Sequence, residues 1–320
     1  MSAVPVIDVS RGREEVARDV ARAVAEIGFL VVAGHGVPPA TIEATRTAAR
    51  ALFSRPEKEK AAFADAAGTL NRGYTPFRSE FNGSTRTGRA PADLREGFIF
   101  GPFDLPDDPY YATPEAGFAY QDNIWPPGAA DTVTALKAYY RAVEALNVGL
   151  LRIFADALVL PREFFLDKFD RHASTVRLLH YPAQSEPPDE GQLRCGAHTD
   201  FGSHTILLAD DSPGGLQVRG RDGEWIDVIP PADSFIVNIG DLMMTWTNDR
   251  WLSNLHRVAN PPPGGGAGRL SIAFFAHPNY DATIECIETC RRPGEKARHP
   301  PVRAGDYRRR QVTTITAGIA

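Results

Sequence analysis

The chain has 320 residues, a hydrophobic fraction of 43%, a charged fraction of 23% and a formal net charge of −5 at pH 7. These values are typical of a globular protein that buries roughly three quarters of its unfolded surface, and they give no electrostatic reason to expect a nucleic-acid or membrane partner. No stretch reaches the ~18 uninterrupted apolar residues of a membrane span, and residues 1–15 lack the apolar core of a secretory signal.

Cysteine usage favours a reducing compartment. The three cysteines are too few for a disulfide framework, so we expect a cytoplasmic protein. Cys286 and Cys290 stand four residues apart, with neither a second such pair nor a nearby histidine. We interpret them as ordinary structural residues and not as part of a metal site.

The first half of the chain has mainly helical patterns. Residues 13–27 repeat apolar side chains at helical spacing, and Gly28 ends that helix before FLVVAGHGV, a short apolar strand. A second amphipathic segment runs from about residue 39 to residue 63. Residues 66–128 are rich in glycine and proline and predict loops, and a long helix is predicted over about residues 132–158.

After about residue 173 the pattern changes to short strands separated by Gly, Pro and Asp turns every 8–15 residues. This spacing favours an antiparallel sandwich or barrel over βαβ units. We therefore predict an α+β fold, with a double-stranded β-helix (jelly-roll) core and flanking N-terminal and central helices. Residues 1–320 are predicted to form one integrated catalytic domain: a mainly helical region at 1–172, the jelly-roll core at 173–280, and a C-terminal extension at 281–320.

The stretch GAHTDFG, residues 196–202, carries two side chains that bind metals. In a strand, His198 and Asp200 would point to the same side. An imidazole and a carboxylate suit Fe(II), and with a second histidine they form the 2-His-1-carboxylate facial triad. The alternative is a surface His-x-Asp at a strand end. His204 has the same parity, but six residues of strand place it roughly 20 Å away. Spacing alone does not choose the third ligand among His35, His172, His180, His256, His277 and His299.

Several separate motifs resemble one enzyme family. GAHTDFG, FIVNIGDLMMTWTNDRWLSNLHRV at 235–258 and RLSIAFF at 269–275 are similar to the iron- and 2-oxoglutarate-dependent oxygenases of the isopenicillin N synthase-like superfamily. VPVIDVS, GFLVVAGHGV, REGFIFG and RLLHYP resemble further signatures of that superfamily in the same order. The similarity extends over most of the chain.

This resemblance implies a set of site residues. The family's iron ligands correspond to His198, Asp200 and His256, and its Arg-x-Ser pair, which binds the distal carboxylate of 2-oxoglutarate, corresponds to Arg269 and Ser271. The last two share a strand face, so a guanidinium and a hydroxyl can meet one carboxylate. Taken alone, Arg269 could instead be a surface charge that begins a strand.

The resemblance also implies a role for Tyr181, which often contacts the same carboxylate but could be a core aromatic residue. The sequence departs from the family pattern at His180, where many plant members carry asparagine. Asn238, Gly240 and Asp241 match the family too, but NIGD is interpreted as turn structure without a chemical role.

The implied function is that of an Fe(II)/2-oxoglutarate-dependent dioxygenase. Such an enzyme uses O2 to oxidise, most often to hydroxylate, an unactivated C–H bond while 2-oxoglutarate becomes succinate and CO2. A carboxylate at Asp200 argues against a halogenase. Two alternatives remain: an iron oxidase of the isopenicillin N synthase or ethylene-forming type that needs no 2-oxoglutarate, and a non-catalytic metal-stabilised binding protein.

The sequence says less about the substrate. We expect a small molecule, no nucleic-acid or membrane partner, and a monomer. Candidate pocket residues are Tyr74, Phe98, Phe201 and Phe275, each of which could instead be core packing. The basic run at 308–310 is interpreted as a solvated helix face, with a lid over an anionic substrate as the alternative.

Overall fold

The computed structural model describes residues 4–66, 69, 71–84, 90–184, 186–209, 215–262 and 267–317, without the side chains of 315–317. The α-helices are α1 (Arg13–Glu26), α2 (Pro39–Phe53), α3 (Glu57–Ala61), α5 (Ala130–Ala157), α6 (Asp241–Trp246) and α7 (Ala304–Ala317). Short 3-10 turns are η1 (Pro109–Ala112), η2 (Ala116–Phe118), η3 (Leu166–Lys168) and η4 (Glu288–Cys290). Among the described residues, none of the helices combines the length and apolar composition of a membrane-spanning segment.

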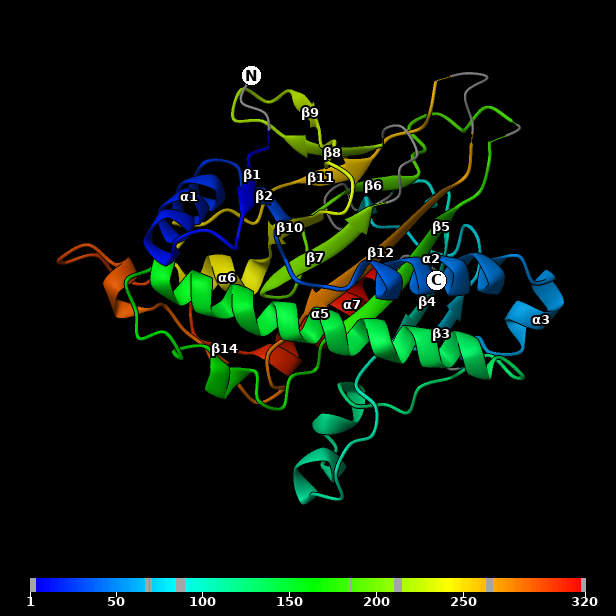
Figure 1. The fold of residues 1–320 in the computed structure, drawn as a ribbon, viewed down its shortest axis with the longest axis horizontal. Helices are drawn as coiled ribbons and strands as arrows, with labels where there is room; N and C mark the ends of the chain where they lie inside the picture. Colours follow the sequence, from blue (N-terminus) through cyan, green and yellow to red (C-terminus); the bar gives the residue numbers. More distant parts are fainter. Residues whose placement is uncertain are drawn as a thin grey trace.

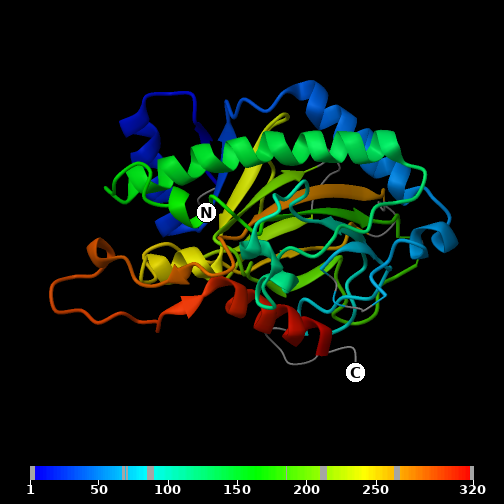
Figure 2. The same cartoon turned by 90° about the horizontal axis from the view of Figure 1, so that it is seen from below.

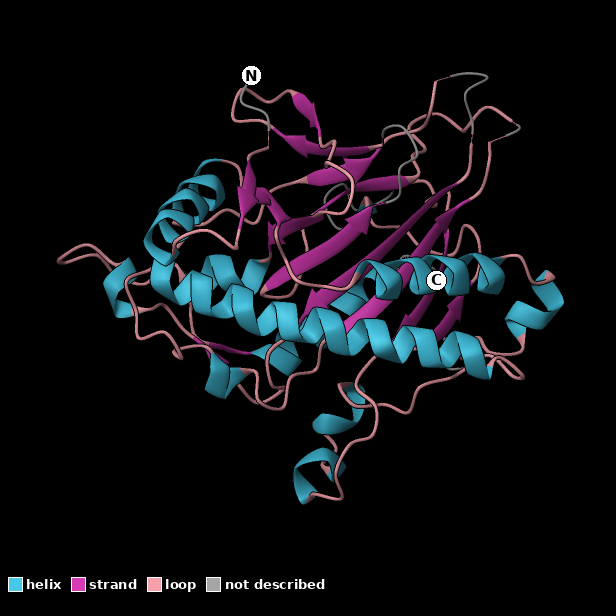
Figure 3. Ribbon diagram, viewed as in Figure 1, coloured by secondary structure: helices cyan, strands magenta, loops and turns pink. Residues whose placement is uncertain are grey.

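An eight-stranded sheet forms the centre of the molecule (Figures 1 and 3). Its order is β1 (Val6–Asp8), β2 (Phe29–Ala33), β10 (Phe235–Ile239), β7 (His204–Ala209), β12 (Arg269–Ala276), β5 (Thr175–Tyr181), β4 (Glu96–Phe100) and β3 (Gly73–Thr75). Only the β1–β2 pairing is parallel; every other neighbouring pair in this sheet is antiparallel. A smaller antiparallel sheet has the order β6 (Cys195–His198), β11 (His256–Val258), β8 (Leu216–Arg219) and β9 (Trp225–Asp227). A third, two-stranded sheet pairs β13 (Thr283–Ile284) with β14 (Val302–Arg303).

One face of the large sheet packs against the helices, and the other lines a cavity. Alternate side chains of a strand point to opposite faces. On β12, Leu270, Ile272 and Phe274 belong to the main hydrophobic core, together with apolar residues of α1, α2 and α5. The residues between them, beginning with Arg269 and Ser271, line a cavity that the smaller sheet closes from the other side.

The long helix α5 crosses the core face of the large sheet next to α1 and α2, and α7 lies on the opposite side of that sheet (Figure 2). The predictions of a helix at 13–27 and of a long central helix are confirmed within two residues at each end. The predicted segment over 39–63 is instead two helices. They are separated at Pro56, because proline lacks an N–H donor and disfavours the helical conformation in the residue before it.

The description of residues 1–172 as mainly helical is incomplete. This region supplies β1, β2, β3 and β4 to the large sheet. The strands β3 and β4 fall within residues 66–128, which the glycine and proline content predicted to be loops. They have only three and five residues, so no extended alternation marks them in the sequence.

Candidate active site

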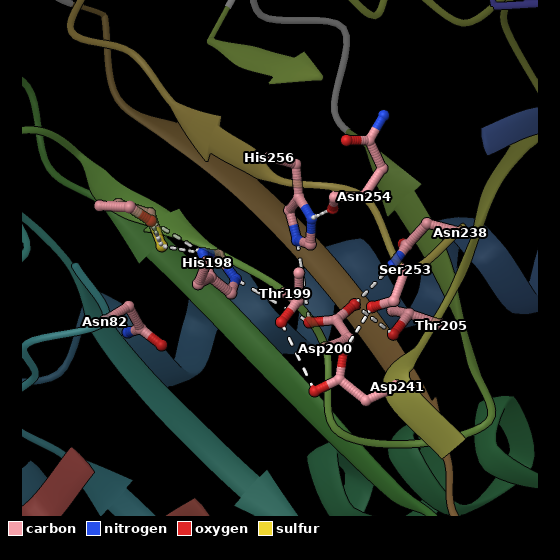
Figure 4. Close-up of polar contacts among 12 residues, drawn as sticks. Asn82, His198, Thr199, Asp200, Thr205, Asn238, Asp241, Ser253, Asn254 and His256 are labelled. Carbon is pink, nitrogen blue, oxygen red and sulfur yellow. Dashed lines mark hydrogen bonds and ion pairs between the residues drawn. The ribbon is translucent and has the colours of Figure 1, made fainter. Parts of the chain in front are cut away.

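Two neighbouring strands of the smaller sheet and one loop bring the predicted metal ligands together (Figure 4). His198 ends β6, and His256 begins β11 directly opposite it in the antiparallel ladder. Asp200 lies two residues past the end of β6, in the loop before β7. The prediction that a single strand aligns His198 and Asp200 was wrong; the turn after β6, not strand alternation, directs the carboxylate toward the histidines.

The ligand atoms are close enough for one ion. The Oδ1 atom of Asp200 lies 3.8 Å from Nε2 of His198 and 3.7 Å from Nε2 of His256, and all three ligand atoms lie within 4.8 Å of one another. Atoms that share an ion at bond lengths of ~2.1 Å can lie at most about 4.2 Å apart, so both measured separations fit a common ion. This donor set is the one that non-haem Fe(II) prefers.

Backbone carbonyls orient both imidazoles. Nδ1 of His198 lies 2.8 Å from the carbonyl oxygen of Gly196, and Nδ1 of His256 lies 3.1 Å from that of Asn254. A carbonyl oxygen only accepts, so each Nδ1 carries the proton and donates it. Each Nε2 lone pair therefore points toward Asp200 and is available to a metal.

The carboxylate of Asp200 is also oriented. Its Oδ2 atom accepts hydrogen bonds from Oγ1 of Thr205 at 2.5 Å and from Nδ2 of Asn238 at 2.7 Å, which leaves Oδ1 facing the histidines (Figure 4). The interpretation of Asn238 as turn structure was wrong, because it lies on β10 and contacts a metal-site residue directly. The alternation of side chains along β7 and β10 places Thr205 and Asn238 on the cavity face of the large sheet. Strand alternation could therefore have identified both partners of Asp200.

The protonation states suit a metal as well. Burial, reinforced by the neighbouring His256, lowers the pKa of His198 to about 3. Burial alone would raise the pKa of Asp200, but the two imidazoles and the hydrogen bonds from Asn238 and Thr205 together hold it below its ordinary value. A neutral imidazole and an ionised carboxylate are the metal-binding forms, so the site needs little proton release to bind an ion.

We predict that Thr205→Val weakens Fe(II) binding about 10- to 100-fold, the usual effect of losing a group that orients a metal ligand. Valine keeps the shape of threonine but cannot donate a hydrogen bond to Asp200. The measurement is the Fe(II) concentration that gives half-maximal activity.

Thr45→Val serves as the matched control. Thr45 is also buried but lies on α2, where its hydroxyl donates to the carbonyl oxygen of Thr41. Thr205→Ser should restore most of the affinity. An unchanged iron dependence in Thr205→Val would remove Thr205 from the orienting contacts.

His204 and His180, which flank the site motifs in the sequence, point away from the site. His204 begins β7 with its ring 5.1 Å from that of Phe154 on α5, so it faces the helices. His180 stacks on Phe53 of α2, and its Nδ1 lies 2.7 Å from Oε1 of Glu96. Although His180 precedes Tyr181 in the sequence, its side chain lies away from the cavity that Tyr181 lines.

The predicted cosubstrate residues cluster in the same cavity as the metal ligands. Arg269 pairs with Tyr181 across the β12–β5 ladder, and both are buried, as is Ser271. All three line the cavity that also contains His198, Asp200 and His256. Burial raises the pKa of the Tyr181 phenol, although a hydrogen bond from Arg95 opposes the change. Tyr181 thus acts as a neutral group whose known partner is Arg95.

The predicted substrate residues divide into two pairs. Phe201 and Phe275 line the cavity, as expected. The prediction that Tyr74 and Phe98 line the pocket was wrong, because both side chains are buried in the main core. Phe98 pairs with Leu178 on the face of the sheet toward the helices. Proximity to motifs suggested them, whereas strand parity selects the neighbouring Ile99, which does line the cavity.

The basic run at 308–310 is only partly a solvated helix face. Arg309 and Arg310 are exposed, but Arg308 is buried and lines the cavity together with Val312. Tyr307, the residue before Arg308 on α7, donates a hydrogen bond of 2.8 Å to Asp241 at the start of α6, so Asp241 connects the two helices. Asp241 also accepts a 2.6 Å bond from Ser253 and is therefore more than a turn residue.

Comparison with known proteins identifies the family. The profile of the 2OG-Fe(II) oxygenase superfamily matches residues 172–278, and that of the non-haem dioxygenase in morphine synthesis N-terminal region matches residues 4–128. The 2-oxoglutarate-Fe(II) type oxidoreductase hxnY of Emericella nidulans is 36% identical over 87% of this chain and 78% of its own length. The chain belongs to the 2OG-Fe(II) oxygenase superfamily.

Other members of this superfamily agree in sequence and in fold. Homoarginine-6-hydroxylase 2-ODD-233 of Oryza sativa subsp. japonica is 31% identical over 90% of this chain and 86% of its own length. The crystal structure of a full-length Neurospora crassa protein in complex with alpha-KG and thymine matches with a TM-score of 0.84 and 27% identity, covering 97% of this chain and 96% of that one. A 2OG-Fe(II) oxygenase family protein from Caulobacter crescentus gives a TM-score of 0.86 and 29% identity over 98% and 100%. The predicted jelly-roll core with flanking helices is confirmed, and so is a 2-oxoglutarate-dependent dioxygenase function with iron, 2-oxoglutarate and O2.

Proposed function

We propose that this dioxygenase hydroxylates an unactivated C–H bond of a small molecule, with His198, Asp200 and His256 as the iron ligands. The observation that carries the proposal is that these three side chains and the buried Arg269 face one cavity. We further propose that it works as a monomer in the cytoplasm and that residues 1–320 act as one catalytic domain.

Different residues of the cavity bind the cosubstrate, hold the iron and exclude water. Arg269 and Ser271 bind the distal carboxylate of 2-oxoglutarate, because a planar guanidinium recognises a carboxylate through two parallel hydrogen bonds. Bound iron supplies O2 activation at the coordination positions that the three ligands leave open. The apolar side chains of Phe29 and Leu207 line the cavity and limit water near the site. The ring of Phe29 meets that of His256 edge-on, with 5.4 Å between the ring centres.

The test is O2 uptake by the Fe(II)-loaded enzyme with a panel of small molecules, with and without 2-oxoglutarate. We expect uptake to require 2-oxoglutarate and to yield one succinate for each molecule of hydroxylated product. Substrate-dependent uptake that proceeds equally well without 2-oxoglutarate would favour the iron oxidase alternative.

We predict that the enzyme consumes 2-oxoglutarate much more slowly without substrate than with it. Tyr181 and Phe201 line the cavity, so their aromatic rings would be the groups oxidised if bound iron activated O2 there without a substrate. Succinate formation measures the rate, and mass spectrometry detects oxygen added to either residue. Fast succinate formation without substrate in an undamaged enzyme would contradict this prediction.

A further inference from the structure

Arg308 on α7 is a buried cation in the cavity wall. Its side chain is only 6% exposed. Its Nη2 atom donates to Oδ1 of Asn71 at 2.7 Å and its Nη1 atom to the carbonyl oxygen of Ala173 at 3.3 Å, and both acceptors are neutral. Within the described ranges no carboxylate forms an ion pair with Arg308. Burial and the nearby Arg72 lower the pKa of Arg308 to about 9, so the guanidinium is still charged at neutral pH.

The other charged side chains of the wall have counter-charges. Glu80 pairs with both Arg177 and Arg95, and Arg95 also lies 3.7 Å from Asp93. Asp200 faces the iron site, and Arg269 is assigned to the cosubstrate. Among the described residues of this wall, Arg308 is the remaining cation, and an uncompensated buried charge is strongly destabilising unless a ligand balances it.

Further donors line the same cavity. His277 follows directly after β12, is 8% exposed, and has no hydrogen-bond partner at Nδ1. Arg177 of β5 has no partner at Nε. Both line the cavity together with Arg308. Buried polar atoms are normally satisfied, so an unpaired His277 nitrogen near the Arg308 charge, and a second unpaired nitrogen in the same wall, indicate a bound group that accepts hydrogen bonds.

From these contacts we infer that the substrate carries a carboxylate and that Arg308 binds it, with His277 beside it. Arg308 is the unbalanced cation among the described residues that line the cavity, whereas its buried neighbour Arg72 donates to backbone carbonyl oxygens and does not line it. One such cation matches a singly charged anion and not a dianion such as a phosphate ester. The inference rests on the proposed function and specifies the class of substrate that the same cavity takes.

The two carboxylate sites lie at opposite ends of one strand. Arg269 begins β12, whereas Phe275 and His277 stand six and eight positions later, which at ~3.3 Å per residue is roughly 20–26 Å along the chain. The cosubstrate and the substrate acid therefore enter separate charge environments, so each carboxylate has its own arginine.

The experiment measures binding without turnover. The enzyme is loaded with Mn(II) in place of Fe(II), saturated with 2-oxoglutarate, and titrated calorimetrically with acid and amide pairs: phenylacetate and phenylacetamide, octanoate and octanamide, and benzoate and benzamide. We expect at least one acid to bind more tightly than its amide. Arg308→Gln should weaken that acid roughly 10- to 150-fold, the loss of a charged hydrogen bond, and leave the amide unchanged.

Two variants separate recognition from structure. Arg308→Lys keeps the charge and should retain the preference for the acid. Arg310→Gln removes an exposed arginine of the same helix and should change nothing. Amides that bind as well as acids, or a panel in which no acid shows binding that depends on Arg308, overturns the inference.

The 2-oxoglutarate titration distinguishes this inference from the proposed function. Arg308→Gln should bind 2-oxoglutarate as the unchanged enzyme does. Weakened 2-oxoglutarate binding in this variant would move Arg308 into the cosubstrate site and overturn the substrate inference alone. If the unchanged protein bound an acid at Arg308 but had no 2-oxoglutarate-dependent activity, the proposed function would fail and the anion site would remain.

Discussion

Asp200→Ala is expected to abolish turnover and iron binding together. Asp200 is the only anionic group among the three ligands, and its Oδ1 atom lies within 4 Å of both histidine Nε2 atoms. Loss of a group that merely orients a ligand costs about 10- to 100-fold, so loss of the ligand itself should exceed that range. Iron per chain after anaerobic reconstitution, expected near one in the unchanged protein, and 2-oxoglutarate turnover measure the effect.

Asp200→Asn refines this prediction. An asparagine oxygen can still accept the hydrogen bonds of Thr205 and Asn238, so the fold and its thermal midpoint should be retained while iron is lost. His198→Ala and His256→Ala should lose turnover in the same way. Full activity in any of these variants would remove that residue from the triad.

The control histidines differ in what they control. His299→Ala removes a partly exposed ring that contacts Asp249 at the surface and should change neither iron content nor activity. His204→Ala should keep iron but leave a cavity against α5. His277→Ala should also keep iron, but its position in the cavity wall excludes it as a control for turnover.

Arg269→Gln should weaken 2-oxoglutarate binding roughly 10- to 150-fold, since a hydrogen bond to a charged group is worth ~1.5–3 kcal/mol and each 1.4 kcal/mol is a factor of ten. Arg269 is 5% exposed and approaches the cavity from the first position of β12. Iron affinity should be nearly unchanged. Steady-state kinetics should show a raised KM for 2-oxoglutarate before any fall in kcat.

A cosubstrate analogue tests the reason for this effect. 2-Oxobutyrate lacks the distal carboxylate, so its binding should suffer far less from Arg269→Gln than that of 2-oxoglutarate. If the variant instead kept its 2-oxoglutarate affinity and lost its substrate, Arg269 would bind the substrate acid. The assignments of Arg269 and Arg308 would then have to be exchanged.

The sequence identified the parts of the site that lie in short, fixed motifs. His198 and Asp200 are two residues apart, so any local structure places them near each other, and Arg269 and Ser271 share a strand face by parity alone. The third ligand could not be derived this way. His256 reaches the others only through the β6–β11 ladder, and its position came from the resemblance to the family.

Residues that depend on tertiary contacts were the ones missed. Arg308 follows ordinary helical charge patterning, and only the position of α7 against the cavity distinguishes it from Arg309 and Arg310. Tyr74 and Phe98 failed for a related reason. The strands β3 and β4 are too short to show which face is buried, and in the large sheet both faces are covered, so hydrophobicity does not separate core from cavity.

The alternation along β12 also constrains how this protein can change over evolution. Inserting or deleting one residue early in the strand would turn Arg269 and Ser271 toward the helices and Leu270 into the cavity, so folding and activity would be lost in the same step. A single substitution does not shift this alternation. A change at Ala273 or Phe275 reshapes the cavity without touching the helix-facing core, so new substrate preferences can arise there at little cost in stability.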